Sequence, residues 1–277
     1  MDHVANQQKT EALALRYGAD AVPAAGPWND HIALLLSHRS VRGYRPDAPP
    51  EGTLETLVAT AQSAATSSNM QTWSVLSVNN PAARAELARI ANDQKHIQQC
   101  PLFLVWLADV ARNQRVAAEE GETLEAAPYL EAFLVAAIDA ALAAQNAVVA
   151  AESLGLSTVY IGALRNEPET VSRLLGLPDG VVCLFGLCIG YAAEATSNEV
   201  KPRLPQSIVL HHETYATTGE TAERHAYDLR MGAFSRRNEV SADDWTRRVI
   251  RRMGKIKAMN GRHTLRSTLE RLGFPLR

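Results

Sequence analysis

The longest apolar stretch of the chain runs between Pro128 and Gly155 and predicts one long helix. Ala and Leu dominate this stretch and no Gly or Pro interrupts it, so helix propensity favours a continuous helix of roughly 40 Å. Pro128 suits the first helical turn, and Gly155 suits the left-handed position after the last. Glu131 and Asp139 lie within the run, which argues against a membrane span. The many Ala residues instead favour a buried helix packed closely on both sides, including against a second copy of the chain.

Shorter apolar runs predict strands around this helix. Residues 74–78, 102–107, 156–165 and 180–190 are rich in aliphatic, β-branched or aromatic side chains. Because residues 102–107 are apolar without alternation, we expect a sheet covered by helices on both faces. Helices are expected over residues 7–17, 29–37, 50–65, 81–92, 109–121 and 168–175, and the chain is charged and helical from residue 220 onward.

Composition and charge describe an ordinary globular protein. The chain has 277 residues, of which 46% are hydrophobic and 21% charged, with a net charge of -2. This balance gives no global attraction to nucleic acid or membranes. Four arginines recur near helix spacing close to the C-terminus, and such a face is typical of a solvated or partner-contacting helix: Arg247, Arg248, Arg251 and Arg252. Without a groove-reading motif, they do not indicate DNA binding.

The cysteines and the first residues bear on the cellular compartment. Cys100, Cys183 and Cys188 form no CxxC motif, and two of them lie in an apolar run. Buried, reduced thiols in a cytoplasmic protein are therefore expected. The first ten residues show no basic region followed by an apolar core, so no secretory signal is visible.

Three loops concentrate groups that bind anions or polar ligands. Residues 38–46 contain arginines, a histidine and a serine around Gly43, although a solvated basic turn would have the same composition. Residues 199–205 present Lys201 and Arg203 beside prolines that restrict the backbone. Residues 66–73 hold more hydrogen-bonding side chains than a turn requires, although loop chemistry alone also produces such segments.

The sequence lacks the motifs of several kinds of catalytic and binding site. The eight histidines form no HExxH pattern and the cysteines are badly spaced for a ligand set, so no metal site is predicted. The GxSxG turn of serine hydrolases, the GxxxxGK[ST] phosphate loop and the dinucleotide-binding GxGxxG are all missing. The remaining inventory of basic loops, buried strands and a glycine turn is that of a mononucleotide cofactor site, where the cofactor supplies the reactivity.

Taken together, these segments resemble the flavin-dependent nitroreductase family, specifically its branch of NADPH-preferring FMN reductases and oxygen-insensitive nitroreductases. The matching pieces follow the family's order over about residues 30–210, at 38–42, 65–68, 94–96, 144–147, 150–155, 159–162, 184–190 and 201–205. The resemblance implies an α+β fold with a central mixed sheet flanked by helices. It also implies an intertwined homodimer with FMN at the subunit interface, and ping-pong transfer from NADPH to FMN and then to an acceptor.

The resemblance further implies roles for single residues at the FMN phosphate and the pyrimidine edge. The phosphate ligands that it implies are His38, Arg39, Ser40, Lys201 and Arg203. A dianion between several donors is satisfied by charge-assisted hydrogen bonds. Arg42 matches a basic position at the flavin pyrimidine edge, where a fixed cation favours the reduced state and tunes the potential.

Other matches concern the ribityl chain and the flavin ring. Ser68 and Gln94 match ligands of the ribityl chain and ring edge, and His96 is a further carried-over position. The backbone beside flavin N5 matches Tyr160, Ile161, Gly162 and Ala163. Ala163 stands where the family often has a second Gly, which backbone contacts tolerate if its torsions suit a residue with a Cβ. No catalytic acid or base is predicted, because hydride transfer needs alignment above the ring and protons can come from water.

Two regions depart from the family pattern. Residues 1–28 form an N-terminal extension, residues 29–215 the nitroreductase-like FMN-binding core, and residues 216–277 a helical C-terminal extension of the same domain. Relatives place an arginine pair shortly before a Trp, but residues 241–244 precede Trp245 here without one. We therefore take Arg236 and Arg237 as candidates for the NADPH 2'-phosphate, with solvated surface as the equal alternative.

The expected function is an NAD(P)H-dependent FMN oxidoreductase that reduces nitroaromatics, quinones or free flavin. One alternative is a specialised single-acceptor reductase, such as a dehalogenase or a diaphorase-like enzyme. Another is a non-catalytic FMN-binding or storage protein. Expected partners are a second copy of the chain and small-molecule electron acceptors, with no nucleic acid and no membrane.

Overall fold

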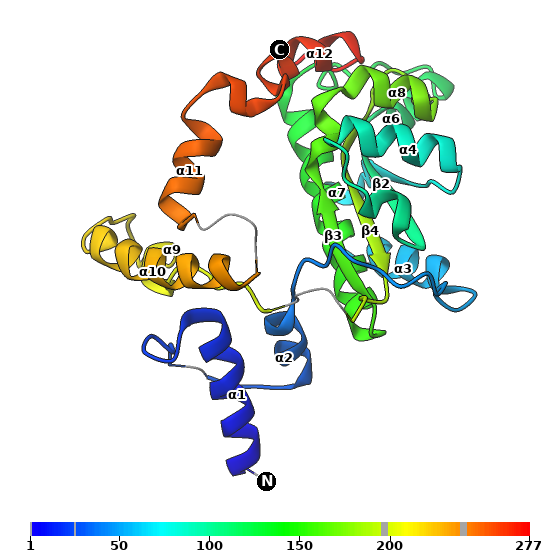
Figure 1. The fold of residues 1–277 in the computed structure, drawn as a ribbon. Coiled ribbons are helices and arrows are strands. Elements are labelled where there is room, and N and C mark those ends of the chain that lie inside the picture. Colours follow the sequence, from blue (N-terminus) through cyan, green and yellow to red (C-terminus); the bar gives the residue numbers. More distant parts are fainter. Residues whose placement is uncertain (1, 25, 195–198, 239–242) are drawn as a thin grey trace. The chain divides into compact units, whose positions relative to one another are not determined.

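The chain folds into two compact units (Figure 1). The computed structural model describes the backbone of residues 2–24, 26–194, 199–238 and 243–277, and their side chains from Gln7 onward. One unit consists of Met1–Arg39 and Ser197–Met259, and we call it the helical unit. The other consists of Ser40–Thr196 and Asn260–Arg277, and we call it the sheet unit. The division expected from the sequence, with boundaries after residues 28 and 215, stays a prediction.

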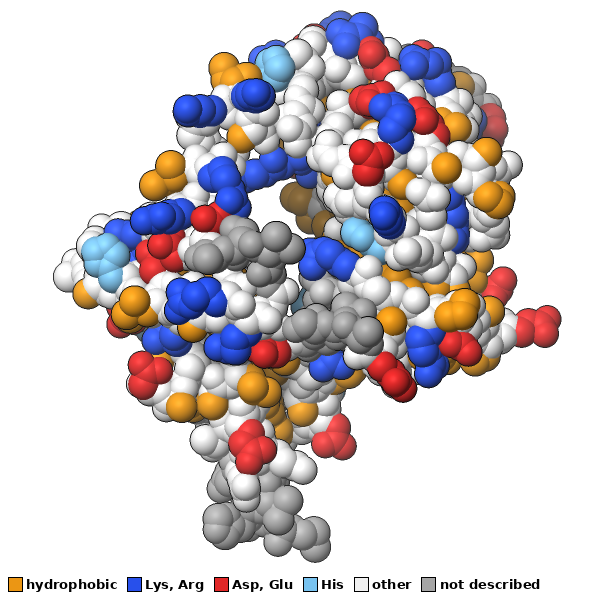
Figure 2. All heavy atoms as spheres, in the orientation of Figure 1, with side chains coloured by type: hydrophobic (Ala, Val, Ile, Leu, Met, Phe, Trp, Pro, Cys, Tyr) orange, Lys and Arg blue, Asp and Glu red, His pale blue; other side chains and the backbone are white. Residues whose placement is uncertain are grey.

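The helical unit is built from helices and turns. Its elements are α1 (Asp2–Tyr17), α2 (Asp30–Ser37), α9 (Gln206–Val209), α10 (Glu220–Asn238), α11 (Trp245–Met253) and the 3-10 turn η3 (Ile256–Met259). The start of α2 follows from Asn29, whose side chain accepts a hydrogen bond from the Ile32 N–H at 3.0 Å and caps the helix. Arginine side chains lie along α11, and Figure 2 shows charges of both signs scattered over the face in view.

The sheet unit holds four strands and most of the remaining helices. The strands are β1 (Trp73–Ser77), β2 (Leu102–Asp109), β3 (Ser157–Ile161) and β4 (Val181–Gly190). The helices and turns are α3 (Thr53–Gln62), η1 (Ser67–Asn69), α4 (Pro81–Ile90), α5 (His96–Gln99), α6 (Ala111–Glu119), α7 (Leu130–Ser153), η2 (Gly162–Asn166), α8 (Pro168–Leu175), η4 (Arg262–Thr264) and α12 (Leu265–Arg271).

The sheet has the strand order β1-β2-β4-β3, and each neighbouring pair is antiparallel. The α+β class is confirmed, but the expectation of a mixed sheet was wrong for these strands. Among the described residues, parallel pairing occurs in the isolated bridge between Ser40 and Thr158. The apolar pattern could not reveal strand direction, because an antiparallel strand covered on both faces is as continuously apolar as a parallel one.

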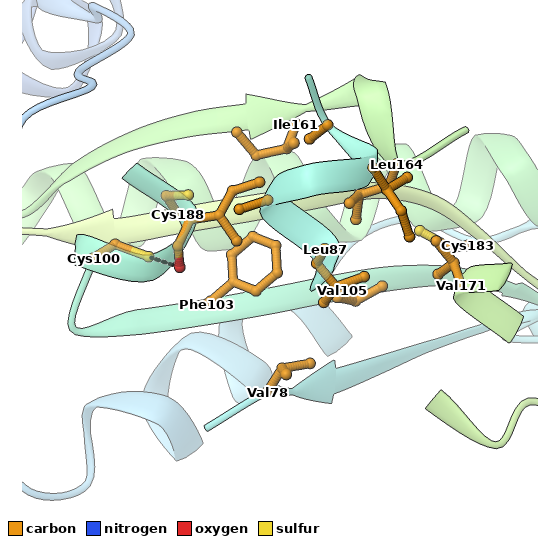
Figure 3. Close-up of a cluster of buried hydrophobic side chains, with 14 of the residues drawn as sticks. Val78, Leu87, Cys100, Phe103, Val105, Ile161, Leu164, Val171, Cys183 and Cys188 are labelled. Carbon is orange, nitrogen blue, oxygen red and sulfur yellow. Dashed lines mark hydrogen bonds between the residues drawn. The ribbon is translucent and has the colours of Figure 1, made fainter. Parts of the chain in front are cut away.

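Strand β2 shows why the run at residues 102–107 is apolar throughout. Phe103 and Val105 enter one hydrophobic cluster with α4, α5 and α8 (Figure 3), whereas Leu104 and Trp106 enter a second cluster with α3 and α7. Successive side chains of a strand point to opposite faces, so burial of both faces requires apolar residues at every position. Helices therefore cover both faces of the sheet, as expected.

Helix α7 is the central element of the sheet unit. Its buried face is mostly alanine, including Ala140, Ala144 and Ala147, which are fully buried. Among the helices of the described residues, α7 alone has the length and hydropathy of a membrane span. The buried face of α7 packs against the sheet in two hydrophobic clusters, with Ala144 and Ala147 in one and Ala140 in the other, which identifies α7 as the core helix of a folded domain.

The limits of two helices differ from expectation. Helix α7 begins at Leu130, so Pro128 precedes it; the Pro128 carbonyl accepts a hydrogen bond from the Arg277 N–H at 3.0 Å. Gly155 has a φ of +76°, the left-handed conformation that the sequence predicted. Helix α3 begins at Thr53 rather than residue 50, because Gly52 before it is left-handed. The cysteines are buried and form no disulfide among the described residues.

Candidate functional site

The helical unit holds the basic residues that the sequence assigned to a phosphate. His38 caps the end of α2 and is half-buried, and Arg39 after it is exposed. Lys201 is half-buried and Arg203 is exposed. Both segments contact α1: the Arg16 side chain donates to the His38 and Lys201 carbonyls at 2.8 Å each. The structure therefore brings two segments together that lie far apart in the sequence.

Helix α10 supports the segment that carries Lys201. The Lys201 ammonium lies 5.4 Å from the centroid of the Phe234 ring. The Tyr227 hydroxyl donates a 3.1 Å hydrogen bond to the Pro202 carbonyl. The pKa of Tyr227 is raised, above all by burial, so this hydroxyl remains a hydrogen-bond donor at neutral pH.

A cavity of about 500 Å³ lies within the helical unit. Its lining includes Arg39, Pro202, Phe234 and Arg237, together with Leu15 of α1. Arg39 is a candidate phosphate ligand and Arg237 a candidate for the NADPH 2'-phosphate, so candidates from both groups face one cavity.

The two NADPH candidates have different surroundings in the last turn of α10. Arg237 forms an ion pair with Glu199 at 3.0 Å and is more than half exposed. This pairing holds the pKa of Glu199 below its ordinary value. Arg236 is exposed. The segment before Trp245, where relatives have an arginine pair, includes residues 241 and 242, and these two lie outside the described residues.

Arg42 lies on a segment that runs beside β3 in the sheet unit. Ser40 pairs with Thr158, and the Val41 N–H donates to the Thr158 carbonyl at 3.0 Å. Val41 is fully buried, and its carbonyl accepts a 2.8 Å hydrogen bond from the Tyr44 hydroxyl. These contacts fix the backbone on both sides of Arg42, whose side chain is exposed.

His96 is a buried histidine on which the positive charge of Arg42 acts. The imidazole is 8% exposed, and its Nε2 atom is buried without a hydrogen-bond partner. Burial and then the positive charge of Arg42 lower the pKa of His96 to about 4. His96 is therefore neutral at physiological pH. Gln94, which is half-buried, precedes it after two left-handed residues, Asn92 and Asp93.

The loop that contains Ser68 is held by Asp139, a buried residue of α7. The Asp139 carboxylate accepts hydrogen bonds from the Thr66 hydroxyl at 2.5 Å, the Ser67 N–H at 3.1 Å and the Thr72 hydroxyl at 3.0 Å. Ser68 is exposed and has a φ of +47°. From the sequence, Asp139 was interpreted only as an interruption of an apolar run. A carboxylate in a stretch that is otherwise expected to be buried could have indicated this role, because burying a charge is costly unless it is hydrogen-bonded.

The segment Tyr160–Ala163 comprises the last two residues of β3 and the first two of the turn η2. Ile161 is buried, Gly162 and Ala163 are half-buried, and Tyr160 is exposed. Ala163 lies inside the right-handed 3-10 turn, so its torsions suit a residue with a Cβ, as the sequence argument required. A Cβ at Gly162 would lie 3.3 Å from the Arg165 guanidinium.

The described acidic and metal-binding side chains do not gather into a metal site. Among the described residues, no group of three or more His, Cys, Asp or Glu side chains is arranged to hold an ion. The sites described above thus consist of cations, hydroxyls, an amide and a neutral imidazole, which are groups that bind an anionic organic ligand.

Comparisons with known proteins show which family the chain resembles. Residues 35–191 match the model of the Nitroreductase family, and residues 201–277 match that of the Nitroreductase family, C-terminal domain. The chain is 37% identical to an FMN reductase (NADPH) of Bacillus subtilis, covering 80% of this chain and 90% of that protein. It is 34% identical to the oxygen-insensitive NADPH nitroreductase of Salmonella typhimurium, covering 81% and 91%.

Similarity to solved structures extends to the three-dimensional fold. The structure of the NfrA1 nitroreductase from Bacillus subtilis superposes with a TM-score of 0.82 at 35% identity, covering 89% of this chain and all of that chain. Two family models that match most of the sequence and a shared fold at this identity establish common descent. The chain therefore belongs to the nitroreductase family.

Proposed function

We propose that this protein is an NADPH-dependent FMN oxidoreductase that reduces small acceptors such as nitroaromatics, quinones or free flavin. The observation that carries the proposal is the buried His96, whose Nε2 has no hydrogen-bond partner and whose pKa is lowered by burial and by the positive charge of the exposed Arg42. A cation and a polar atom without a partner are groups that a ring with anionic and hydrogen-bonding edges requires. The relatives named FMN reductase (NADPH) and oxygen-insensitive NADPH nitroreductase support the same class.

The phosphate of FMN fits the donors of the helical unit. His38, Arg39, Lys201 and Arg203 of this unit supply an imidazole, two guanidiniums and an ammonium, and the family resemblance adds the hydroxyl of Ser40, the first residue of the sheet unit. Charge-assisted hydrogen bonds from several such groups satisfy a dianion better than water-exposed single charges. We assign these five residues to the phosphate.

The remaining candidates fit the ribityl chain and the ring. Ser68 and Gln94 offer a hydroxyl and an amide, and His96 offers the nitrogen without a partner. The backbone of Tyr160–Ala163 is assigned to the ring edge at which hydride arrives. Arg42 stabilises negative charge at the pyrimidine edge and thereby favours the reduced state.

The residues above would hold FMN, which would supply the redox chemistry between NADPH and the acceptor in a ping-pong sequence. The protein's share is to hold the ring, to align both substrates in turn over one face, and to supply a fixed positive charge through Arg42. We assign no side chain as an acid or base.

Arg236 and Arg237 are the proposed ligands of the NADPH 2'-phosphate. Arg237 lines the cavity of about 500 Å³ together with Arg39, and its pairing with Glu199 sets the direction of its side chain. A phosphate monoester is a stronger acceptor than a carboxylate for a bidentate guanidinium, so the bound nucleotide can compete with Glu199.

Assembly as a homodimer is proposed from the outer face of α7. Leu130, Leu134, Ile138 and Leu142 follow one another at four-residue spacing and are 44–57% exposed in the single chain. A contiguous apolar row of this kind marks a permanent partner surface. We propose that a second copy covers it, and that the protein works in the cytoplasm, where its buried thiols stay reduced.

Anaerobic spectroscopy tests the function. We expect a yellow protein whose released chromophore has the mass of FMN, which NADPH bleaches and a nitroaromatic recolours. Arg42→Ala should lower the flavin potential and slow reduction by about 10- to 100-fold, the effect of one charged hydrogen bond. Arg45→Ala is the matched control, because Arg45 lies on the same segment but pairs with Asp47. A bound FMN that NADPH cannot reduce would favour the storage protein instead.

A further inference from the structure

The N-terminal helix α1 contributes a buried arginine to the candidate phosphate site. Residues 1–34 precede both stretches that match the family models, so α1 lies outside both matches. Arg16 lies in its last turn and is only 4% exposed. Arginine is seldom buried so deeply unless its guanidinium is hydrogen-bonded, so its hydrogen-bond partners explain its burial.

The Arg16 guanidinium joins two distant segments of the chain. Its Nη1 donates to the Lys201 carbonyl at 2.8 Å, and its Nη2 donates to the Leu36 carbonyl at 2.5 Å and the His38 carbonyl at 2.8 Å. The main chain adds a fourth link, because the Arg203 N–H donates to the Arg16 carbonyl at 2.9 Å. That bond also satisfies a carbonyl at the end of α1 that would otherwise lack a helical partner.

Three of the linked residues, His38, Lys201 and Arg203, are among those assigned to the phosphate. Arg16 contacts His38 and Lys201 through their carbonyls and Arg203 through its N–H. The fork geometry of a guanidinium fixes the relative directions of the carbonyls, which a single ammonium cannot do. Holding the ligands in place before the anion arrives reduces the ordering cost of binding.

We propose that Arg16 is a positioning residue for the FMN phosphate, acting through the backbones of His38, Lys201 and Arg203. This inference rests on the proposed function, because it presupposes an FMN site. Helix α1 thereby becomes part of the cofactor site. The effect of Arg16 is specific for the phosphate and not for the flavin ring, which gives the proposal a readout that a general loss of stability would not produce.

The test compares FMN with riboflavin, which lacks the phosphate. Full-length apoprotein is titrated with each flavin by fluorescence, and FMN release from the holoprotein is followed on dilution. Arg16→Met should weaken FMN binding by about 10- to 100-fold and riboflavin binding by less than about twofold. Arg16→Lys keeps the charge but loses the fork, so we expect FMN binding to stay at least about fivefold weaker than in the wild type.

Glu11→Gln on the exposed side of α1 is the matched control and should bind both flavins as the wild type does. Wild-type affinity for FMN in Arg16→Lys, equal weakening for both flavins, or loss of the folded apoprotein in both Arg16 variants would each overturn the proposal. If the wild-type protein itself shows no preference for FMN over riboflavin, the phosphate assignment within the proposed function fails instead, whatever the variants do.

Discussion

The Thr66 hydroxyl donates a 2.5 Å hydrogen bond to the carboxylate of Asp139, although 73 positions separate the two residues in the chain. Asp139 is 2% exposed and lies on the face of α7 that packs into the sheet unit. Its further bonds to Ser67 and Thr72 tie the whole loop around Ser68 to the central helix. The conformation of a candidate flavin ligand thus depends on one buried acid.

Asp139→Asn tests that dependence. The amide keeps the shape but turns donor hydrogens toward hydroxyl and N–H donors, so buried donors lose their acceptor. We expect the free energy of unfolding to fall by about 2–4 kcal/mol in urea titrations, and protease cleavage near residues 66–72 to accelerate. Glu131→Gln, an exposed acid on the same helix, is the control and should change stability by less than about 0.5 kcal/mol. Equal effects of the two changes would contradict the role of Asp139.

The burial of His96 predicts how stability depends on pH. Its pKa lies at about 4 in the folded protein, below the ordinary 6.5, so the unfolded chain binds more protons between these values. The contribution of neutral His96 is therefore complete above pH 6.5 and is lost as the pH falls towards 4, at a cost of up to roughly 3 kcal/mol.

His96→Gln should remove this component of the pH dependence. Unfolding free energies measured from pH 4 to 7.5 should fall less steeply on acidification in the variant than in the wild type. Arg42→Ala should raise the pKa of His96 in an NMR titration, since the Arg42 charge is one cause of its depression. His31→Gln, at an exposed position on α2, is the control. Identical slopes in wild type and His96→Gln would show that His96 does not stay neutral.

Gly186 of β4 lies too close to Phe103 to accept a side chain. A Cβ at Gly186 would stand 2.6 Å from Phe103 Cζ. Gly186→Ala should therefore destabilise the protein by about 1–3 kcal/mol through overpacking, measured by denaturant unfolding. The additional change Phe103→Leu should recover part of the loss. Gly26→Ala has open space around its Cβ and serves as control; an equal cost there would point to backbone effects instead.

The apolar row on α7 predicts the oligomeric state. Replacing both Ile138 and Leu142 with Asp places charges in the proposed dimer interface, so sedimentation at micromolar concentration should shift from dimer to monomer. Val116→Asp on α6 changes an equally exposed apolar residue outside that row and should leave the dimer intact. A wild-type protein that is monomeric, or a double variant that stays dimeric, would rule out this surface.

The candidate NADPH residues predict a change in coenzyme preference. Joint replacement of Arg236 and Arg237 with Ala should raise the KM for NADPH about 10-fold or more and leave the KM for NADH nearly unchanged, because only NADPH carries the extra phosphate. Glu199→Gln is the matched control, since it removes the ion pair of Arg237 but keeps the guanidinium. Equal loss with both nucleotides would assign these arginines to structure or to the acceptor.

Much of the secondary structure was predictable because local sequence decides it. The apolar run at residues 102–107 became the buried strand β2, and Pro168–Leu175 became α8 with a left-handed Gly176 after it. Strand direction was not predictable, since the same apolar pattern suits parallel and antiparallel strands buried on both faces. The start of α7 was misjudged, because Pro128 bonds to the C-terminal residue rather than opening the helix.

The sequence by itself determined the chemistry that this protein offers: a basic segment at residues 38–42, a second at 201–203, and the order of motifs that identifies the family. Only the tertiary structure decided that Asp139 holds the Ser68 loop, that Arg16 joins His38 to Lys201, and that His96 is buried near Arg42. The physical reason is distance along the chain. These contacts join residues tens to nearly two hundred positions apart, and burial, which sets the strength of each, exists only once the chain has folded.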